Sequence, residues 1–221
     1  MFISVALIHP SAKAVPMLTE VAHDVIADVE LIHMVDEGVQ RMMTEAGGMT
    51  EPVTRRICSC AMNAQEAGAE VVMLASPRLG AAVDAVCSSV RIPVVRIDEA
   101  MADAAVQLGN AVGVLSADET VLEASLALLR ERAVAHEKDV DLDTALCDEA
   151  RQALESNDLA AYDRAVMAGV DQLAGNDMVV LADVMMHRVV HTAAEQASVP
   201  VLASPRHGFE DMAKRLNYFR R

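Results

Sequence analysis

The chain has 221 residues, and its 33 acidic and 18 basic side chains give it a formal net charge of −15 at pH 7. Nucleic acid and anionic membrane are polyanions, so both are disfavoured as partners. With 53% hydrophobic and 23% charged residues, the chain has enough apolar material for a packed core. It has no Trp, two Tyr and three Phe, so recognition of sugars or single strands by ring stacking is not expected.

Short β-branched runs alternate along the chain with longer stretches of helical periodicity. This alternation is typical of an α/β protein whose parallel sheet is covered on both faces by helices. Eight strands are predicted, and they fall into two sets of four, so the chain is expected to consist of two related halves. The predicted strands are residues 2–8, 28–34, 71–75, 93–97, 111–115, 135–140, 178–182 and 199–203.

The opening run, MFISVALIHP, is apolar and of strand length, with no basic region before it. It therefore resembles neither a signal peptide nor a membrane anchor, and we expect a cytoplasmic protein. The four cysteines agree with a reducing compartment, since no pair has the CxxC spacing of a zinc or redox site. Cys58, Cys60 and Cys147 are expected within helices, and Cys87 two or three helical turns beyond Ser76.

The two halves are joined near residues 99–109, a stretch with no linker-like composition that we expect to be helical. Two nearly identical segments, LASPRLG at 74–80 and LASPRHG at 202–208, look like an internal repeat. The first follows the third strand of one half, and the second follows the fourth strand of the other. The two segments are therefore not expected to occupy equivalent positions.

The turns after the predicted strands are the places where chemistry is expected. In open parallel sheets, ligands bind beyond the carboxyl ends of the strands, where the N–H groups of helix N-termini favour anions. These turns carry small hydroxyls and two arginines, as in Ser76-Pro77-Arg78 and Ser204-Pro205-Arg206. Such a set suits a small carboxylate ligand.

Several segments, in this order and spacing, resemble the aspartate/glutamate/hydantoin racemase superfamily, which also includes maleate isomerases and arylmalonate decarboxylases. The resemblance extends end to end and implies two pseudosymmetric four-stranded α/β domains, 1–98 with 205–221 and 99–204, and an active site in the cleft between them. The segments are residues 4–9, AGGMTEPVTRRI at 46–57, EAGAEVVML at 66–74, PVVRIDEAMADAAV at 93–106, GVLSADETVLEASLALL at 113–129 and PVLASPRHG at 200–208.

Racemases of this superfamily use two cysteines, one from each domain, as base and acid on opposite faces of the substrate. Carried onto this sequence, the two positions hold Ser76 and Asp183. Because a serine hydroxyl is a far weaker base than a thiolate, two-thiol racemisation is expected to be lost. The resemblance then implies an isomerase or lyase that needs no cofactor and acts beside the carboxylate of an amino acid, a hydantoin or a malonate-like acid.

Each candidate also has a structural interpretation. Ser76 is either a helix N-cap that also contacts ligand or, less readily, a nucleophile, and Pro77 at the first helical position supports the cap. Asp183 is either a general acid or base with its pKa raised by burial, or again a helix cap. His187 and His191 follow Asp183 at helical spacing, so the three are expected on one helix face, where Asp183 and His187 are weak metal candidates.

The remaining site candidates are expected to bind substrate, and they are His9, Ser11, Pro77, Arg78, Ser116, Thr120, Val184 and Arg206. Arg78 and Arg206 either grip a carboxylate or tie a loop to an acidic neighbour. His9 and Ser11 follow the first strand, where His9 is either a ligand contact or a satisfied structural histidine. Arg55 and Arg56 are expected to be solvated partners of the acidic surface, and the charges at 131–143 to form an exposed edge.

Two other classes of function stay open. One is a hydrolase or metal-assisted enzyme that uses Ser76, Asp183 and His187, and the other is a small-acid binder without catalysis. In every case the partner is a small carboxylate. The Met-rich, Ala-rich helices also suggest a homo-oligomer, because part of their apolar surface is expected to be covered by another subunit.

Overall fold

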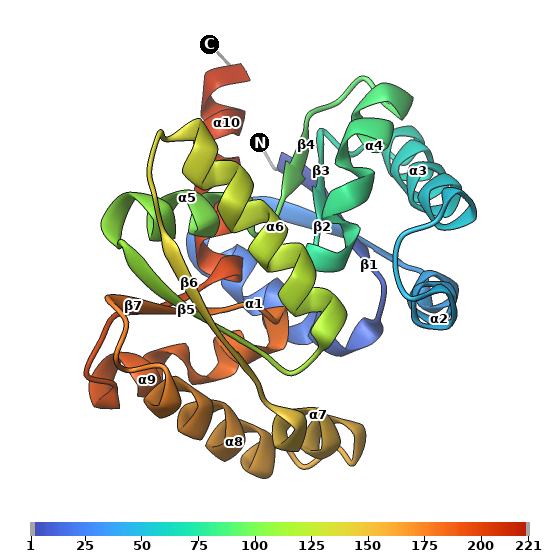
Figure 1. Cartoon of the computed structure of the whole chain (residues 1–221). Helices are drawn as coiled ribbons and strands as arrows, with labels where there is room; N and C mark the ends of the chain where they lie inside the picture. Colours follow the sequence, from blue (N-terminus) through green and yellow to red (C-terminus); the bar gives the residue numbers. More distant parts are fainter. Residues whose placement is uncertain (1–2, 220–221) are drawn as a thin grey trace. The chain divides into compact units, whose positions relative to one another are not determined.

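The structure, a computed structural model, describes residues 3–219 (Figure 1). Phe2, the first residue of a predicted strand, lies outside the described residues. The chain divides into two compact units, which we call unit 1 and unit 2. Unit 1 contains Met1–Ile97 and Pro205–Arg221, and unit 2 contains Asp98–Ser204.

Each unit is built on one four-stranded parallel sheet, and the two sheets have the same strand order. In unit 1 the order is β2-β1-β3-β4, and in unit 2 it is β6-β5-β7-β8. The central strands are apolar and buried, as a parallel sheet covered on both faces requires. The strands are β1 (Ile3–His9), β2 (Val29–Val35), β3 (Val71–Leu74), β4 (Val94–Arg96), β5 (Ala111–Ser116), β6 (Asp141–Leu146), β7 (Met178–Leu181) and β8 (Val201–Ala203).

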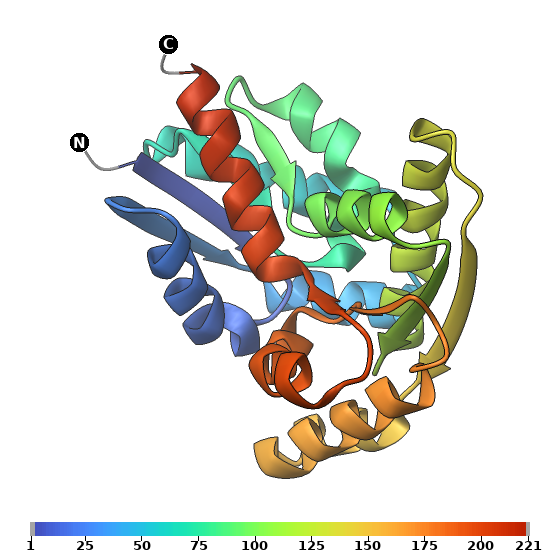
Figure 2. The same ribbon diagram turned by 90° about the vertical axis from the view of Figure 1, so that its left-hand side faces the viewer.

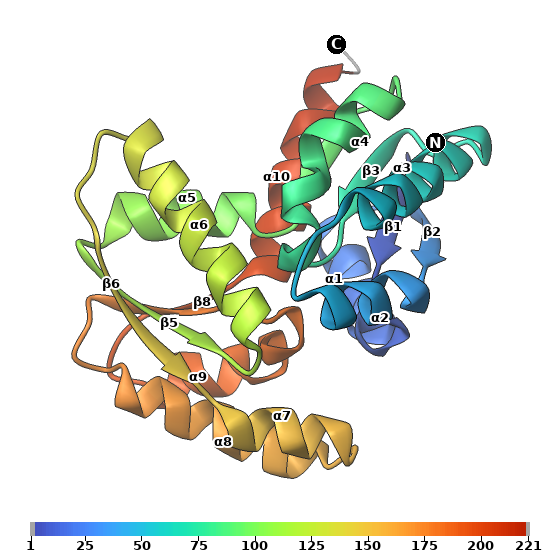
Figure 3. The same ribbon diagram turned by 45° about the vertical axis from the view of Figure 1, so that its right-hand side comes forward.

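In unit 1, α3 and α4 cover one face of the sheet, and α1 and α10 lie on the other (Figures 2 and 3). Ile8 and Leu74, paired across β1 and β3, share a buried cluster with Ile57 of α3 and Val86 of α4. The helices are η1 (Ala12–Ala14), α1 (Val15–Val25), α2 (Glu37–Ala46), α3 (Glu51–Glu66), η2 (Pro77–Ala82), α4 (Val83–Ser89) and α10 (Ser204–Phe219), where η marks a 3-10 helix.

In unit 2 the two faces of the sheet belong to two separate buried clusters. Leu115 and Leu181 pack with Val166 of α8 on one face, and Val114 and Val180 pack with helices α5 and α6 on the other. Alternate residues of each strand thus enter opposite clusters. The helices are α5 (Glu99–Leu108), α6 (Glu119–Ala135), α7 (Asp148–Glu155), α8 (Leu159–Gln172), η3 (Val184–Val189) and α9 (Val190–Gln196).

The last strand of each sheet leads into a helix that belongs to the other unit. Helix α5 follows β4 but is part of unit 2, and α10 follows β8 but is almost entirely part of unit 1. The junction predicted to be helical is therefore confirmed as α5. In unit 1, a Cβ atom on Gly208 would lie 2.5 Å from the carbonyl oxygen of Ile97, so a glycine is needed for α10 to pack beside the end of β4.

One predicted strand is wrong. Residues 135–140 were expected to be extended, yet Ala135 ends α6, Glu137 has a left-handed φ of 53°, and the strand is Asp141–Leu146. Among residues 3–219 this strand pairs with β5 alone, at the edge of its sheet, and it is largely exposed. An edge strand needs little apolar sequence, so the polar run DLDTAL carried no strand signal. The other seven predictions overlap the observed strands.

Candidate active site

Ser76 and Asp183 occupy equivalent positions in the two units. Each is the residue before a six-residue 3-10 helix that follows the third strand of its sheet, β3 for Ser76 and β7 for Asp183. The backbone N–H of the residue before each of them donates to the first strand, Ala75 to Ile8 at 3.0 Å and Ala182 to Leu115 at 2.9 Å. Both side chains therefore start from the carboxyl edge of a parallel sheet.

The Asp183 carboxylate is held by the neighbouring strand end. Its Oδ2 accepts from the Ala117 N–H at 2.8 Å and lies 2.7 Å from the Ser116 hydroxyl, whose one proton it shares with the Asp118 carbonyl at 2.8 Å. Hydrogen bonds to a charged acceptor are stronger than neutral ones, so these two donors orient the carboxylate. Asp183 makes no side-chain cap hydrogen bond to η3. Asp183 is therefore the N-cap residue of η3 by position only, and its carboxylate is engaged across the sheet edge instead.

Two further groups near Asp183 were not singled out from the sequence. The Tyr162 side chain of α8 is completely buried, and its hydroxyl has no hydrogen-bond partner among the described residues. Burial raises the pKa of Tyr162 far above its usual value, and the nearby charge of Asp183 raises it further. The sequence offered one signal for this group, because Tyr162 is spaced like a core residue from Val166 and Val170 on the same helix.

Cys147 is the second of these groups, and its predicted place inside a helix is wrong. It follows β6 directly as the residue before α7. Its Sγ donates to the Ala165 carbonyl at 3.4 Å, and burial is the largest cause that raises the pKa of the thiol, with Asp183 a smaller one. A thiol held in this way stays protonated at neutral pH. Cys58 and Cys60 are in α3 as expected.

Ser76 is half-buried and begins η2, with Pro77 at the first helical positions as expected. Ser76 is the N-cap residue of η2, the position predicted for it, but its hydroxyl makes no side-chain cap hydrogen bond. Pro77 is buried and Arg78 half-buried on the same short helix.

Three polar side chains of unit 1 form a chain at the end of β1. His9 is 1% exposed, and its Nε2 lies 3.0 Å from Nδ1 of His33 on β2. The other ring nitrogen of His33 lies 3.1 Å from Thr19 Oγ1 on α1. Burial, and then His33, lowers the pKa of His9 to about 4. His9 is thus a neutral imidazole across the physiological range.

The other predicted binding residues have identifiable local roles. Ser11 caps η1, accepting from the Lys13 N–H at 3.4 Å. Thr120 donates its hydroxyl to Asp118, the N-cap of α6, at 2.6 Å, and Val184 is buried at the start of η3. Arg206 lies in the first turn of α10, where it pairs with Glu210 at 3.2 Å. From the set of predicted binding residues, Ser116 lies directly against a proposed catalytic side chain, that of Asp183.

The surface arginines of α3 have acidic partners as expected. Arg56 contacts Asp36 through two of its nitrogens, at 2.8 and 2.9 Å, and Arg55 pairs with Glu51 one turn away. The Arg56 guanidinium is the main cause that lowers the pKa of Asp36.

The expected alignment of Asp183, His187 and His191 on one helix face is wrong. Val184–Val189 is a 3-10 helix with about three residues per turn, so a spacing of four does not return to the same face. His191 is exposed on α9. Among the residues that the structure describes, no group of three or more His, Cys, Asp or Glu side chains has a metal-binding arrangement.

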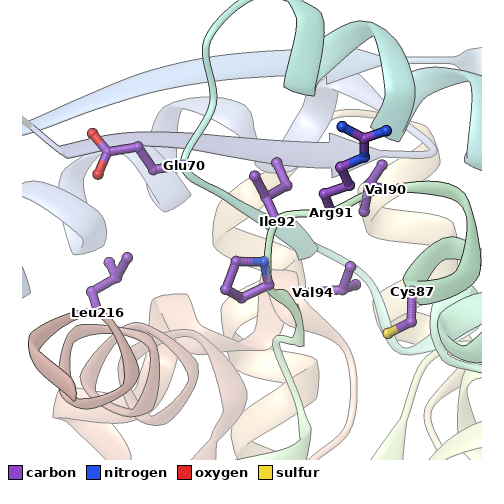
Figure 4. Close-up of a pocket in the computed structure, with 8 residues that line it drawn as sticks. Glu70, Cys87, Val90, Arg91, Ile92, Val94 and Leu216 are labelled. Carbon is purple, nitrogen blue, oxygen red and sulfur yellow. The ribbon is translucent and has the colours of Figure 1, made fainter. Parts of the chain in front are cut away.

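A groove of about 510 Å³ lies in unit 1 (Figure 4). Glu70 and Pro93, which line it, come directly before β3 and β4, so it lies at the amino ends of these strands. Ser76 and His9 are at the opposite, carboxyl end. None of the predicted site residues lines this groove.

Comparisons with known proteins agree on the fold. No protein-family model matches the chain, and no curated protein matches it by sequence. An aspartate racemase from Picrophilus torridus superposes with a TM-score of 0.75 at 11% identity, covering 97% of this chain and 94% of that one. Allantoin racemase from Klebsiella pneumoniae gives 0.69 at 15% identity, with 98% and 88% covered. Arylmalonate decarboxylase gives 0.64 at 18% identity, with 96% and 92% covered.

Two four-stranded parallel sheets flanked by helices define an α/β protein of two units, as predicted. The same fold is found in solved structures of aspartate, glutamate and allantoin racemases and of an arylmalonate decarboxylase. At these identities the likeness shows the fold. Within residues 3–219, no helix is long and apolar enough to cross a membrane.

Proposed function

We propose that the protein is an enzyme that acts beside the carboxylate of a small acid, as an isomerase or lyase, without a cofactor. The observation that carries the proposal is the equivalent placement of Ser76 and Asp183 after β3 and β7. Both are the positions to which the resemblance assigns proton transfer. The racemase and decarboxylase folds of the similar structures support the same class of reaction.

Asp183 is the stronger chemical candidate of the two. A carboxylate oriented by Ser116 and Ala117 is a far better base than a serine hydroxyl. In the proposed step the proton leaves the carbon beside the substrate carboxylate for the Asp183 carboxylate, and its electron pair stays on the substrate as an enediolate. Isomerisation is complete when a proton from solvent reaches the opposite face of that carbon and Asp183 releases the proton it took to solvent. For a malonate-like acid, loss of CO₂ generates the same carbanion.

The partner role we assign to Ser76 is donation to the substrate carboxylate. A serine hydroxyl carries one O–H donor, and Ser76 follows β3 at the carboxyl edge of the sheet, where it can donate to an anion. Of the other candidates, His9, Ser11, Pro77, Arg78, Thr120, Val184 and Arg206 remain proposed ligand contacts at the strand ends. The cleft expected between the two domains also remains a prediction.

Solvent exchange tests this proposal. The protein is incubated in deuterated water with amino acids, hydantoins, malonates and maleate, and deuterium on the carbon beside the carboxylate is measured by mass spectrometry or NMR. We expect exchange, or deuterated decarboxylation product, with at least one acid, and a loss of about 100-fold or more in Asp183→Asn. Absence of exchange with every acid would contradict the enzyme, and binding without turnover would indicate the non-catalytic binder.

Asp177 offers a matched control for that variant. It precedes β7 as Asp183 follows it, and its Oδ2 accepts from two backbone N–H groups of the neighbouring strand, those of Asn110 at 2.8 Å and Ala111 at 3.0 Å. Asp177→Asn therefore removes a carboxylate with similar bonding from the opposite edge of the sheet. We expect it to leave exchange unchanged, so a loss shared by both variants would mark a structural effect.

Self-association belongs to the same proposal. Leu108 at the end of α5 and Val134 in the last turn of α6 are 72% and 79% exposed. Burial of such side chains against a second copy would be favourable. We expect light scattering to give a mass well above the 23.6 kDa of one chain, and a monomer would contradict the assembly.

A further inference from the structure

The hydrogen-bond chain at the end of β1 fixes which nitrogen of each histidine carries a proton. Thr19 Oγ1 lies 2.8 Å from the Val15 carbonyl, which can only accept, so the single hydroxyl proton of Thr19 is used there. Towards His33 Nε2, at 3.1 Å, Thr19 can then only accept. His33 Nε2 therefore carries the N–H of that ring.

The same logic continues into His9. A neutral His33 has one N–H, so its Nδ1 is a bare acceptor. The contact of 3.0 Å between His33 Nδ1 and His9 Nε2 must then be donated by His9. His9 Nδ1 is left as a bare lone pair. Because burial lowers the pKa of both rings, neither gains the extra proton that would change this assignment at neutral pH.

This lone pair has no hydrogen-bond partner among the described residues, although His9 is 99% buried. Buried polar atoms are almost always satisfied, and an unsatisfied one in a native fold calls for an explanation. His9 is also the unit 1 equivalent of Ser116, which contacts Asp183 in unit 2. Each follows the strand residue that pairs with the end of the third strand, Ile8 with Leu74 and Leu115 with Leu181. Ser116 holds the catalytic candidate Asp183, whereas His9 turns to His33.

We propose that His9 Nδ1 accepts a hydrogen bond from the ligand and thereby sets the class of acid that the site takes. This inference rests on the proposed function. The preferred ligands carry an N–H or O–H donor beside the carboxylate, as 2-amino acids and 2-hydroxy acids do, or beside the equivalent ring carbonyl, as hydantoins do. Dicarboxylates without such a donor, such as succinate or maleate, would leave the lone pair of His9 without a partner. A site built for a donor rejects the analogue that lacks it.

Matched pairs of acids test this specificity. Malate is compared with succinate, lactate with propionate, and hydantoin with 1,3-dimethylhydantoin, by calorimetry and thermal shift. We expect the donor-bearing member of each pair to bind at least about 10-fold more tightly. Equal binding within the pairs overturns the inference but leaves the enzyme proposal standing if deuterium exchange occurs. Absence of binding by every acid overturns both.

Two variants separate an acceptor from a merely structural histidine. In His9→Gln the amide nitrogen replaces Nε2 as donor to His33 while the Nδ1 lone pair is lost, so the ratio within each pair should fall to about 1. Thr19→Val leaves His9 in place but removes the group that fixes the tautomer of His33. It should also reduce the ratio, because His9 can then present an N–H. A ratio unchanged in both variants contradicts the proposal.

The protonation of each His9 ring nitrogen can also be measured on the unmodified protein, so this test does not depend on a variant that folds. Long-range proton–nitrogen NMR spectra distinguish bare from protonated ring nitrogens of histidine. We expect His9 to be protonated on Nε2 and bare on Nδ1 at neutral pH, and the Nδ1 signal to move when malate is added at saturating concentration. A protonated Nδ1 in the free protein, or an Nδ1 signal unaffected by every acid that binds, would overturn the inference.

Discussion

At the carboxyl end of the first strand, unit 1 has His9 and unit 2 has Ser116, and these equivalent residues are used differently. Ser116 donates to Asp183 at the end of the adjacent third strand, at 2.7 Å. His9 instead bonds to His33 on the strand at its other side, at 3.0 Å, and Ser76, the equivalent of Asp183, makes no cap bond. The equivalent strand ends thus carry a hydrogen-bonded carboxylate, Asp183, in unit 2 and a neutral imidazole, His9, in unit 1.

The contrast extends to the position after the second strand. Asp36 and Cys147 are equivalent, since the N–H of each donates to the carbonyl of the first-strand residue, His9 at 3.0 Å and Ser116 at 2.8 Å. Asp36 caps α2 and pairs with Arg56, whereas Cys147 makes no side-chain cap bond. The strand order therefore fixes the backbone position of each residue. The type of side chain at that position decides whether the group is charged and how strongly it binds a proton.

The largest effect is expected when the two units carry the same side chain at the position after their third strands. Ser76→Cys combined with Asp183→Cys places one thiol in each unit, after β3 and β7. Inversion needs a base on one face and an acid on the other, so we expect the double variant to exchange substrate protons about 100-fold faster than either single variant. Deuterium incorporation into both enantiomers of an amino acid measures it. Equal rates in the single and double variants would show that these are not the two proton-transfer positions.

The neutral histidine of unit 1 predicts a pH dependence of stability. Folding lowers the pKa of His9 from 6.5 to about 4, so between these values the unfolded chain binds more protons. The stabilisation is fully present above pH 6.5 and is lost as the pH falls towards 4, by roughly 3 kcal/mol in total. Urea denaturation at a series of pH values measures this loss. His9→Gln should flatten the curve in this window, and an unchanged slope would contradict the assignment.

Removing the donor that holds Asp183 sharpens the description of unit 2. Ser116→Ala leaves the carboxylate with the Ala117 N–H but without the hydroxyl, and it also removes the bonds of that hydroxyl to the Asp118 backbone. Together these losses should lower the free energy of unfolding by about 2 kcal/mol. Denaturant unfolding gives the value. Ser125 is a matched control, because it is also buried but its hydroxyl has no partner among the described residues. Ser125→Ala should be neutral or stabilising, and equal losses would argue against a role for the Asp183 bond.

The smallest effect is expected at the Asp36 position. Arg56→Met removes the guanidinium that contacts this carboxylate through two nitrogens, and the loss of stability should be small because water screens an exposed ion pair. Arg55→Met, one residue away on α3, removes only an exposed pair with Glu51 and should change stability less. Thermal melts in low and high salt compare the two, and a larger loss in Arg55→Met would contradict this ranking.

The sequence by itself determined the fold class, seven of the eight strands and the turns that hold Ser76 and Asp183. Buried parallel strands have continuous apolar sequences, such as VVML shortly before Ser76 and MVVL shortly before Asp183. The helix that begins after Asp98 and the solvated pairs of α3 were also predictable. These features depend on neighbours within a few residues, and local periodicity reports them.

Only the tertiary structure decided what the candidate side chains do. The edge strand β6 is polar because one of its sides pairs with no other strand of residues 3–219, and the 3-10 form of η3 displaced the expected His187 alignment. Ser116 and Asp183 are 67 residues apart in sequence, and His9 and His33 are 24 apart. Their contacts exist because strand pairing brings the ends of neighbouring strands together, and no local pattern encodes which ends those are.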